Sequence, residues 1–577
     1  MSEILGPEGL PYIPDDVTVV QFILDCHHPA RPVPKHPRAW LIEDATGRQI
    51  CYDEIRARVA GLANALRLRC GIVEDDVVCI FSPNHVDYPI AIWATHRLGA
   101  VITPANPSYH KDELEYQLGI TKAKVILVHP SNYGVALAAA QTLGISSANV
   151  ILFDPLPNES APAALTIHNL VEEGLSKPQS FVERRLKPGE GKTKIAFLSL
   201  SSGTTGRPKA VCIPHIAPIA NCVQMAFASK ANEEYTTWEN RRYRPGDVEL
   251  GVLPFYHIYG LVVVMHFALF CGMTLVVIPK FNFTEMLKSV QRYRINHMKI
   301  VPPMVVLLCK HPATKNHDLS SVKMIMSGAA PLSAELIQQL TERLPNAGIA
   351  QAYGMTETCT TVSWPNLYQK IGTPGSSGLL LPGTVARVVK EDGSLAKYGE
   401  PGQLVVRSPA QALRYLDNDQ ATKETFKDGW VYTGDEVIIN EQKELYIIDR
   451  IKELIKVKGF QVAPAELEGH LLDHPDVTDV CVVSVPDDYS GELPLAFVVL
   501  SEDAQARVNA DTAEVDRIKA ALMKHVSDHK VQYKWLAGGV EFVDAIPKNP
   551  SGKLLRRFLR DRAKELRAGK AQTKTKL

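Results

Sequence analysis

Short apolar segments alternate with segments of helical length over most of this 577-residue chain, and this alternation restricts the fold more than any other feature of the sequence. Apolar runs rich in β-branched residues are typical of strands that are buried on both faces of a parallel sheet. The amphipathic stretches between them are typical of helices that cover such a sheet. The sequence therefore predicts an α/β fold. The expected strands are Val77–Phe81, Val125–Val128, Ile195–Leu200, Met273–Ile278 and Met298–Val301, and the expected helices include Tyr52–Leu68 and Glu335–Leu344.

The pattern changes twice toward the C-terminus. Between Gly383 and Ile448, alternating segments separated by DG, NE and GD turns predict antiparallel strands at Gln403–Arg407, Glu436–Asn440 and Leu445–Ile448. A smaller α/β unit follows, with strands expected at Val480–Val485, Leu495–Leu500 and Val540–Val543 and helices at Ala463–Asp473 and Asp511–His529. We expect a large N-terminal domain of stacked sheets and helices over 1–449, with a β-rich subdomain at about 383–448, and a small C-terminal domain over 450–577.

Charge and cysteine content restrict the function and the compartment. The 63 basic residues balance the 63 acidic residues, which argues against a general nucleic-acid binder because such a protein needs a net basic surface. The segment from Lys553 to the end nevertheless has ten basic and two acidic residues, a net charge of +8 that suits either a solvated helix face or a phosphate-binding patch. None of the ten cysteines forms a CxxC pair, so we expect free thiols in a reducing compartment.

Two segments bear on membranes and location. The 18 residues of Leu261–Ile278 lack charged side chains and just reach the length of a transmembrane candidate, but His266 and Gly272 interrupt them. We expect a buried helix to Phe270 followed by a buried strand, and no membrane span. The N-terminus lacks the basic and apolar regions of a secretory signal. The terminal Thr575-Lys576-Leu577 resembles the Ser-Lys-Leu peroxisomal address, so the expected location is peroxisomal, through an import receptor, or cytoplasmic.

Several familiar motifs are absent or incomplete. The stretch Gly189–Thr193 ends like a phosphate-binding Walker A loop, but Leu186 occupies the position of its first glycine. The GxSxG and GxGxxG fingerprints are missing. Two histidine pairs, His470/His474 and His525/His529, have the spacing of a zinc-protease helix but lack its glutamate, so we interpret them as surface histidines.

One loop combines the features of a polyphosphate site. The residues Ser199–Lys209, SLSSGTTGRPK, follow a predicted strand and bring glycines, hydroxyl groups and two cations together. Glycines let backbone N–H groups turn toward an anion, hydroxyls add donors, and Lys209 adds a positive charge. The alternative is a polar surface turn. The residues that we expect to bind phosphates are Ser201, Ser202, Gly203, Thr204, Thr205, Gly206 and Lys209.

With this loop and the motifs that follow it, the chain resembles the adenylate-forming acyl- and aryl-CoA synthetases over nearly its whole length. The further motifs are Pro254–Gly260, Ser327–Pro331, Gln351–Glu357, Tyr432–Asp435, Asp449–Lys456, Lys458–Gln461 and Pro550–Lys553. The stretch from Lys458 to Glu468 is similar to the 4-coumarate-CoA ligase and luciferase branch. The resemblance implies an enzyme that joins a carboxylic acid to AMP and then transfers the acyl group to CoA, with ATP, Mg²⁺ and CoA as cofactors and co-substrates.

The resemblance also implies residue roles in the first step. Lys553 carries the adenylation, Glu357 and Thr204 hold the metal, Thr356 bonds the α-phosphate, Tyr353 stacks on adenine, and Asp435 binds the ribose with support from Arg450. An aspartate after a glycine, as in Gly434-Asp435, is alternatively a turn residue. Gln351, Ala352, Gly354 and Lys452 complete the expected nucleotide site, and Lys452 also matches the hinge about which the small domain turns.

For the second step, the resemblance implies a mobile C-terminal domain that presents a different face. Lys456 acts in thioester formation, and the expected CoA contacts are Lys280, Lys458, Gly459, Phe460 and Gln461. His257 stands between the carboxylate and the thiol tunnel. The expected acyl pocket consists of His257, Ile258, Tyr259, Val262, Met326, Gly328, Ala329, Gly354, Thr360 and Thr361, most of them apolar or small, which favours an aromatic or medium aliphatic acid.

Departures from the family pattern affect the substrate rather than the reaction. Ala352 replaces a frequent glycine and Thr360 a frequent proline, and Gln403, Ser408 and Leu413-Arg414 depart from the usual GELxVRGPxxxxGY stretch. Three alternatives to a CoA ligase remain: a luciferase-like oxygenase, a stand-alone adenylating enzyme that loads a separate carrier protein, and a non-catalytic nucleotide-binding scaffold. The expected partners are a small carboxylic acid, ATP and CoA, without nucleic acid.

Overall fold

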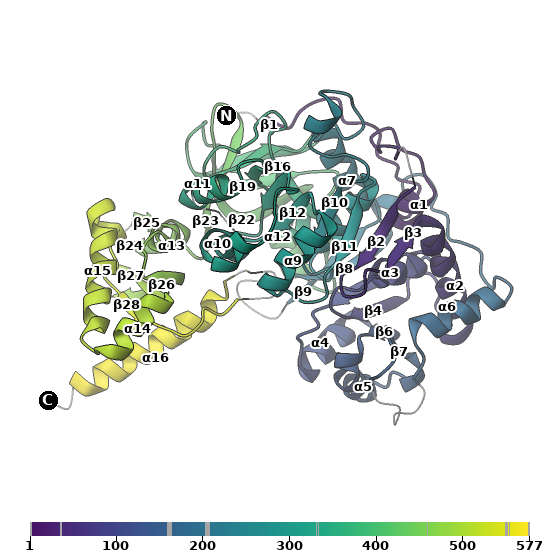
Figure 1. Cartoon of the computed structure of the whole chain (residues 1–577), viewed down its shortest axis with the longest axis horizontal. Coiled ribbons are helices and arrows are strands. Elements are labelled where there is room, and N and C mark those ends of the chain that lie inside the picture. The colour runs from purple at the N-terminus through teal and green to yellow at the C-terminus, as the bar shows by residue number, and fades with distance from the viewer. Residues whose placement is uncertain are drawn as a thin grey trace.

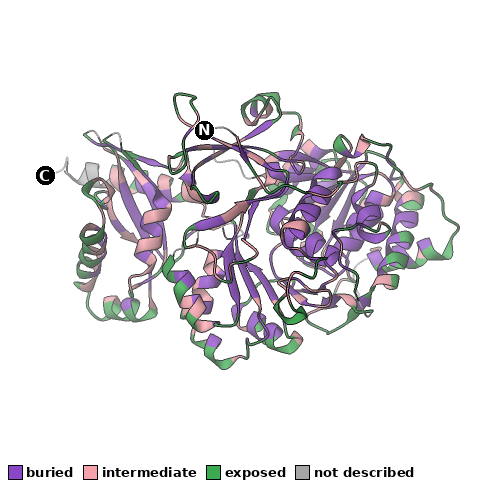
Figure 2. Cartoon of the chain, turned by 90° about the horizontal axis from the view of Figure 1, so that it is seen from above, coloured by how far each residue is buried: buried purple, intermediate pink, exposed green. Residues whose placement is uncertain are grey.

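The computed structural model divides into a large body and a small lobe at its C-terminal end (Figure 1). It describes residues 3–34, 37–157, 164–201, 208–330, 332, 334–458, 460–487, 489–548, 552 and 554–574. Within these residues the strands form four sheets, three in the large body and one in the small lobe. Buried residues follow the sheets and the helix faces that cover them (Figure 2).

Two seven-stranded sheets in the large body have parallel centres, which confirms the predicted α/β class. The first has the order β20-β9-β8-β5-β4-β6-β7 and the second β14-β13-β12-β10-β11-β2-β3. The first consists of β4 (Val77–Phe81), β5 (Val101–Ala105), β6 (Val125–Val128), β7 (Val150–Leu152), β8 (Ile195–Ser201), β9 (Lys209–Pro214) and β20 (Arg414–Tyr415). The second consists of β2 (Ala39–Glu43), β3 (Gln49–Cys51), β10 (Val248–Gly251), β11 (Thr274–Val277), β12 (His297–Ile300), β13 (Met324–Ser327) and β14 (Gly348–Gln351).

Helices connect these strands and cover the two sheets. They are α1 (Val19–Leu24), α2 (Tyr52–Cys70), α3 (Tyr88–Arg97), α4 (Lys111–Thr121), α5 (Tyr133–Thr142), α6 (Ile167–Ser176), α7 (Ile216–Ala228), α8 (Phe267–Phe270), α9 (Phe283–Tyr293), α10 (Pro302–Lys310) and α11 (Ala334–Arg343). The uncharged stretch Leu261–Ile278 divides between a π-helix at Tyr259–His266, α8 and β11, all buried in the core. Among the helices that the structure describes, none is both long and apolar enough to cross a bilayer.

The third sheet has nine strands and extends beyond the β-rich range expected at 383–448. Its strands are β1 (Ile4–Leu5), β15 (Tyr353–Met355), β16 (Thr360–Trp364), β17 (Ser376–Leu380), β18 (Val385–Val389), β19 (Gly402–Arg407), β21 (Phe426–Lys427), β22 (Trp430–Ile439) and β23 (Glu444–Arg450), and α12 (Asp419–Thr425) precedes β21. Strands β15 to β17 thus join the sheet before Gly383, and β1 pairs with β18 from the other end of the chain. Sequence patterning did not reveal these strands because they are short and interrupted.

The small lobe contains a five-stranded sheet with helices packed on both faces. Its strands are β24 (Ile455–Val457), β25 (Phe460–Val462), β26 (Val477–Asp487), β27 (Gly491–Leu500) and β28 (Gly539–Phe542). Its helices are α13 (Pro464–Leu472), α14 (Glu502–Ala510), α15 (Glu514–His529) and α16 (Arg556–Lys574). Separate apolar cores lie on the two faces, one around Leu467 and Leu522 and the other around Phe497 and Leu559. The predicted helix Asp511–His529 begins three residues later, at Glu514.

A buried ion pair fixes the beginning of α16 against the rest of the small lobe. An Nη2 atom of Arg556 lies 2.6 Å from Oε2 of Glu468 in α13, and Oε1 of the same carboxylate accepts from the N–H of Val482 at 2.8 Å. Burial would lower the pKa of Arg556, but Glu468 and Asp449 raise it. The pair therefore links α13, β26 and α16 at the side of the lobe that faces the large body.

The two bodies also meet at the C-terminal end of α13. Lys310, the last residue of α10, donates from Nζ to the carbonyl oxygen of Leu472 at 2.8 Å. A cation at this position satisfies a carbonyl that the helix end leaves without an intrahelical donor. Asp473 follows directly, and burial together with the nearby carboxylate of Glu335 raises its pKa from 3.8 to about 6.

This contact predicts a pH-dependent effect of Asp473→Asn. Besides Glu335, the charged and titratable groups that face Asp473 are Lys310 of α10 and His525 and Lys530 of the small lobe, and these lower its pKa. Because the pKa of Asp473 is higher in the folded than in the unfolded protein, ionisation of Asp473 destabilises the fold. This destabilisation is absent well below pH 3.8, grows between pH 3.8 and about pH 6, and stays constant above pH 6. We expect the variant to have a higher Tm than the parent above pH 6 and the same Tm near pH 3.5.

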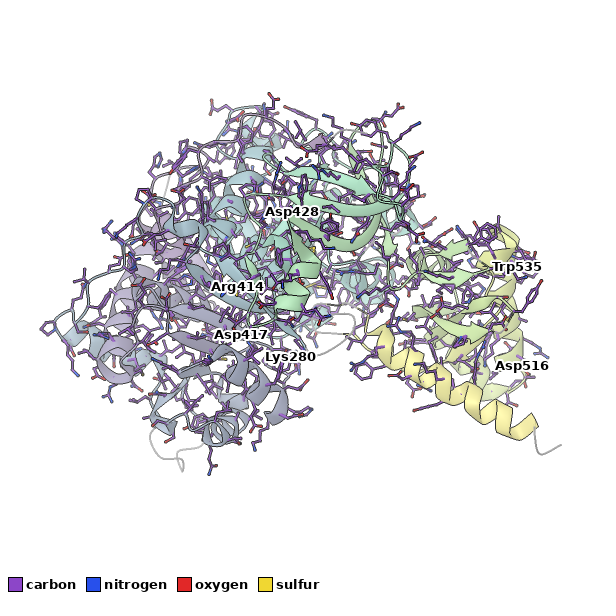
Figure 3. All side chains as sticks on the ribbon, turned by 180° about the vertical axis from the view of Figure 1, so that it is seen from behind. Lys280, Arg414, Asp417, Asp428, Asp516 and Trp535 are labelled. Atoms are coloured by element: carbon purple, nitrogen blue, oxygen red, sulfur yellow. The ribbon has the colours of Figure 1, made fainter. Side chains whose placement is uncertain are left out.

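Thermal unfolding over this pH range measures the effect. Asp516→Asn is the matched control, because Asp516 is exposed on α15 (Figure 3). An equal change in Tm for both variants at every pH would contradict the prediction.

Candidate active site

A cavity of about 900 Å³ lies where the two bodies of the protein meet. Its walls come from the end of β8, the π-helix, the β15–β16 turn, the ends of β22 and β23, and the beginning of α16. Sites at the carboxyl ends of parallel strands and between domains are typical of ligand binding. The cavity brings together most of the residues that the sequence assigned to the nucleotide and acyl sites.

Asp435 and Arg450 form an ion pair at the polar wall of this cavity. Arg450 lines the cavity, whereas the predicted nucleotide residue Asp435 does not and is 3% exposed. The two residues face each other in the β22–β23 pairing, and Nε of Arg450 lies 2.7 Å from Oδ1 of Asp435. The hydroxyl of Tyr353 donates to Oδ2 of the same carboxylate at 2.5 Å. Burial would lower the pKa of Arg450, but Asp435 and Tyr353 raise it, so the guanidinium stays charged. These two contacts hold the Asp435 carboxylate in one orientation.

Glu357 forms a second anionic point, close to the end of β8. Its Oε1 atom accepts from the hydroxyl of Ser201 at 2.9 Å and from the hydroxyl of Tyr415 at 2.7 Å, and the side chain is 4% exposed. The ammonium of Lys209 lies 5.0 Å from the centre of the Tyr415 ring. Because Ser201 pairs with Lys209 across the β8–β9 ladder, the two ends of the predicted phosphate loop meet at this point. The loop residues Ser202, Gly203, Thr204, Thr205 and Gly206 lie outside the described residues.

The remaining nucleotide residues divide into two groups. Ala352, Gly354, Thr356 and Lys452 line the cavity together with Tyr353. Gln351 does not line it: its side-chain oxygen accepts from the N–H of Leu332 at 2.7 Å, and the residue is 5% exposed. Gln351 therefore supports the loop that follows β13 from behind.

The apolar end of the cavity extends from His257 toward Trp364. The expected acyl residues that line it are His257, Ile258, Tyr259, Met326, Gly328, Ala329, Gly354, Thr360 and Thr361. Val262 is fully buried and does not line the cavity, whereas Val263 does. Val263 stands four residues after Tyr259, so the two share a helix face. Tyr256 and Trp364 also line this end, and sequence analysis did not name them.

Three hydroxyl groups at the apolar end are paired with the protein itself. Thr360 donates from Oγ1 to the carbonyl of Ile258 at 3.1 Å, and Tyr259 donates from its hydroxyl to the carbonyl of Met326 at 3.3 Å. Thr361 has its hydroxyl 3.5 Å from Sδ of Met225. A surface with satisfied polar groups favours an apolar ligand, because a polar ligand would lose its hydrogen bonds to water.

The small lobe closes the cavity with residues of the β23–β24 connection and of α16. Glu453, Lys548, Leu554, Leu555, Arg556, Arg557, Phe558 and Arg560 line it beside Lys452. Lys553 lies outside the described residues, but its neighbour Leu554 lines the cavity. On the other side, Gly552 packs so closely on the large body that an added Cβ would come 2.9 Å from Cγ2 of Val301. Of the two described neighbours of Lys553, Leu554 therefore lines the cavity and Gly552 contacts the large body.

The residues assigned to CoA chemistry do not line this cavity. Lys280 is exposed on the large body (Figure 3), and Lys456 is exposed on β24. The ammonium of Lys458 lies 4.4 Å from the ring centre of Tyr489, and the Phe460 ring stacks on that of Tyr533 at 4.6 Å. Gln461 is exposed and lies beside Glu391 of the large body, and Gly459 lies outside the described residues. The lobe presents its α16 side to the cavity, rather than this surface of β24 and β25.

Sequence analysis missed Tyr415 and the cationic side chains at the beginning of α16. Tyr415 follows Leu413-Arg414, which had been noted only as a departure from the usual motif. The net charge of the C-terminal segment was noticed, but Glu468 and Glu453 that pair with Arg556 and Arg560 are distant in sequence. No local sequence pattern links these residues to their partners, because only the fold brings them together.

Known proteins resemble this chain over nearly its full length. The sequence profile described as "AMP-binding enzyme" matches residues 30–416, and that described as "AMP-binding enzyme C-terminal domain" matches residues 466–553. The chain is 35% identical to 4-coumarate–CoA ligase 5 of Oryza sativa subsp. japonica and 37% identical to acyl-CoA ligase AFT1-1 of Alternaria alternata, with 95% of each chain covered in both comparisons.

Solved structures agree with this assignment. The ATP-bound MatB of Rhodopseudomonas palustris is 26% identical and has a TM-score of 0.79, with 96% of this chain and 99% of that chain covered. The same protein in its apo form has a TM-score of 0.68. The chain therefore belongs to the AMP-binding enzyme family, within its branch of acyl- and aryl-CoA ligases.

Proposed function

We propose that this enzyme activates an apolar carboxylic acid, aromatic or medium aliphatic, as an acyl adenylate and then transfers the acyl group to CoA. The observation that carries the proposal is one cavity that joins Glu357 and Arg450, the ion-pair partner of Asp435, to an apolar end whose hydroxyls are paired with the protein. His257 lies between the two ends. An acid whose carboxylate stands at His257 then places its tail against Tyr259 and Trp364.

The first step requires neutralisation of negative charge, because a carboxylate must approach the α-phosphate of ATP. Lys209, Lys452, Arg556 and Arg557 line the cavity and supply positive charge around the polyphosphate. Lys553, beside Leu554, suits the developing charge between carboxylate and phosphate, since an ammonium is a compact point charge. Asp435 accepts from the two ribose hydroxyls, and Tyr353 places its ring against adenine.

The donor set at Glu357 fits a magnesium ion. A carboxylate with hydroxyls beside it, and the phosphates of ATP, are the hard oxygen ligands that Mg²⁺ prefers. Glu357 and Thr204 would hold the ion, which would neutralise phosphate charge during the transfer. Ser201 and Tyr415 orient the carboxylate by donating to its Oε1 atom.

His257 is positioned to orient the substrate carboxylate. Its Nδ1 atom accepts from the N–H of Tyr259 at 3.3 Å. In the neutral ring the proton therefore resides on Nε2, which can donate to a carboxylate oxygen. The adjacent backbone thus selects the tautomer that binds the acid.

The second step requires a different orientation of the small lobe, since the cavity is now closed by the α16 side. We infer that the chain turns near Lys452, between β23 and β24, so that Lys456, Lys458, Gly459, Phe460 and Gln461 reach the adenylate, and that Lys280 meets CoA phosphates. The exposure of Lys456 and Lys458 away from the cavity supports this rearrangement. The higher TM-score to ATP-bound than to apo MatB supports an adenylation orientation here. The peroxisomal address at Thr575–Leu577 stays a prediction.

An acid panel tests the proposed activity. The enzyme is incubated with ATP, Mg²⁺, CoA and aromatic, medium aliphatic and polar dicarboxylic acids, and products are separated by mass. We expect CoA-dependent thioesters from the aromatic or medium aliphatic acids only. Light emission would favour the luciferase alternative. Formation of acyl-AMP without thioester would favour an enzyme that loads a separate carrier protein. Thioesters only from dicarboxylic acids would contradict the proposed apolar pocket.

Replacement of Asp435 by asparagine tests the ribose site. The variant loses an ion pair with Arg450 and an acceptor for charged hydrogen bonds, each contributing about 1.5–3 kcal/mol. Since about 1.4 kcal/mol corresponds to a factor of ten, we expect KM for ATP to rise roughly 10- to 100-fold in a pyrophosphate-release assay. Asp428→Asn, on the exposed turn between β21 and β22 (Figure 3), should leave KM unchanged. Equal KM values for both variants would exclude Asp435 from the site.

Replacement of Lys553 by alanine tests the division of the two steps. We expect acyl-AMP formation to fall roughly 10²- to 10³-fold, the typical effect of removing one group that stabilises transition-state charge. Thioester formation from supplied acyl-AMP should remain largely intact. Lys564→Ala on the exposed side of α16 is the control. An unchanged rate of pyrophosphate release in Lys553→Ala would remove Lys553 from adenylation.

A further inference from the structure

Four histidines gather on the outside of the small lobe, although the sequence places them in two separate pairs. His470 lies in the last turn of α13 and His474 just beyond it, while His525 and His529 lie in the last two turns of α15. The two helices pack through buried leucines and valine, namely Leu467, Leu471, Leu522 and Val526. Each histidine pair has the i, i+4 spacing of the core pair on its own helix. The packing of the two helices therefore also brings the histidine pairs together.

Three of the rings form a compact group. One ring nitrogen of each of His470, His525 and His529 lies within 4.8 Å of the others. The rings of His470 and His525 stack with centres 4.2 Å apart and an interplanar angle of 6°. The ring of His529 lies 5.2 Å from that of His470, and the ring of His474 lies 5.3 Å from that of His525.

Backbone carbonyls fix the tautomers of the three rings. Nε2 of His470 lies 3.0 Å from the carbonyl oxygen of His525, and Nε2 of His525 lies 3.0 Å from the carbonyl oxygen of His470. Nδ1 of His529 lies 3.0 Å from the carbonyl oxygen of His525. A carbonyl only accepts, so each of these nitrogens donates and each neutral ring keeps one free lone pair. Metal-binding histidines almost always have such an acceptor on their second nitrogen.

Burial favours the neutral form of two of the four histidines, His470 and His474. Burial lowers the pKa of His470, and its neighbours His525, Lys530 and His529 lower it further, while its bond to the carbonyl of His525 opposes these effects. Burial also lowers the pKa of His474. A neutral imidazole is the form that binds a metal ion, and clusters of imidazoles suit Zn²⁺, Ni²⁺ and Cu²⁺ rather than Mg²⁺ or Ca²⁺.

We propose that His470, His525 and His529 bind one transition-metal ion, with Zn²⁺ as the representative, and that the ion links α13 to α15. Two nitrogens bound to one Zn²⁺ at about 2.1 Å each lie at most about 4.2 Å apart. Because the lone pairs lie in the ring planes, the stacked rings of His470 and His525 must turn out of their parallel arrangement to complete the site. Water or His474 supplies the fourth ligand. None of these residues lines the cavity between the two bodies, so this site is separate from the adenylation chemistry.

The position of the site gives the ion a structural consequence. His470 stands two residues before Leu472, whose carbonyl accepts from Lys310 of the large body. An ion that holds α13 to α15 therefore restrains the helix end by which the lobe contacts the large body. It should also stabilise the folded lobe, because a ligand that binds only the folded state raises Tm.

A competition titration tests the site on the full chain, prepared without a histidine tag and freed of metal by a chelator. We expect one Zn²⁺ per chain to be drawn from a chromophoric chelator, Zn²⁺ to raise Tm, and affinity to fall as the histidines become protonated at lower pH. His529→Asn should weaken binding at least about tenfold, by analogy with the losses seen at metal sites. His529 is exposed, so its replacement leaves the core intact.

Two further variants make the test decisive. His470→Asn should weaken Zn²⁺ binding as His529→Asn does, and it should also abolish the rise in Tm. His168→Asn removes one exposed histidine from α6 of the large body, where it pairs with Glu172, and should bind Zn²⁺ like the parent. The proposal is overturned if the parent takes no Zn²⁺ from the chelator, or if the His470 and His529 variants bind it as tightly as the His168 variant.

Discussion

The contact between Asp435 and Arg450 is the constraint on which the rest of this active site depends. The pairing of β22 with β23 sets the two side chains opposite each other, and Tyr353 from β15, the last strand in the order of the same sheet, completes the group. Arg450 is also the last residue of β23, after which the chain leaves the large body. One hairpin thus forms the nucleotide site and begins the connection to the small lobe. A displacement of this hairpin would change both the ribose contacts and the direction in which the lobe leaves.

The small lobe, in turn, is held together by charge pairs that are largely shielded from water. Glu468 holds Arg556 and Glu453 holds Arg560, so the first turns of α16 face the cavity while their charges are matched from within the lobe. Removal of one partner of such a pair leaves a buried charge and costs about 3–5 kcal/mol. These pairs join α13, α16 and the 451–454 connection into one unit, as the proposed turn near Lys452 requires. A lobe that serves two chemical steps in turn needs to be rigid itself and to be joined by a short connection.

The sequence predicted the elements and motifs well where they are local. Val77–Phe81 and Val125–Val128 form strands with the predicted bounds, and the uncharged stretch at Leu261–Ile278 contains a buried helix and strand. Long-range contacts were not predictable in this way. Tyr415 reaches Glu357 across 58 residues, and the histidine pairs of α13 and α15 meet only because their helices pack. Val262 was named in place of Val263 because a sequence match does not show which face of a π-helix borders a cavity.

The wall of the acyl end contains a strained backbone turn. Thr360 has a φ of 95°, and Cys359 before it a φ of 50°, values that β-branched and other L residues rarely adopt and that cost about 1–3 kcal/mol each. Proline, which is frequent at this position in the family, fixes φ near −65° and cannot adopt this conformation. Gly354 permits the strained turn, since an added Cβ would come 1.5 Å from the Thr360 carbonyl oxygen. Because Thr360 also donates to the carbonyl of Ile258, the strained turn is held against the beginning of the π-helix, and both residues line the acyl end of the cavity.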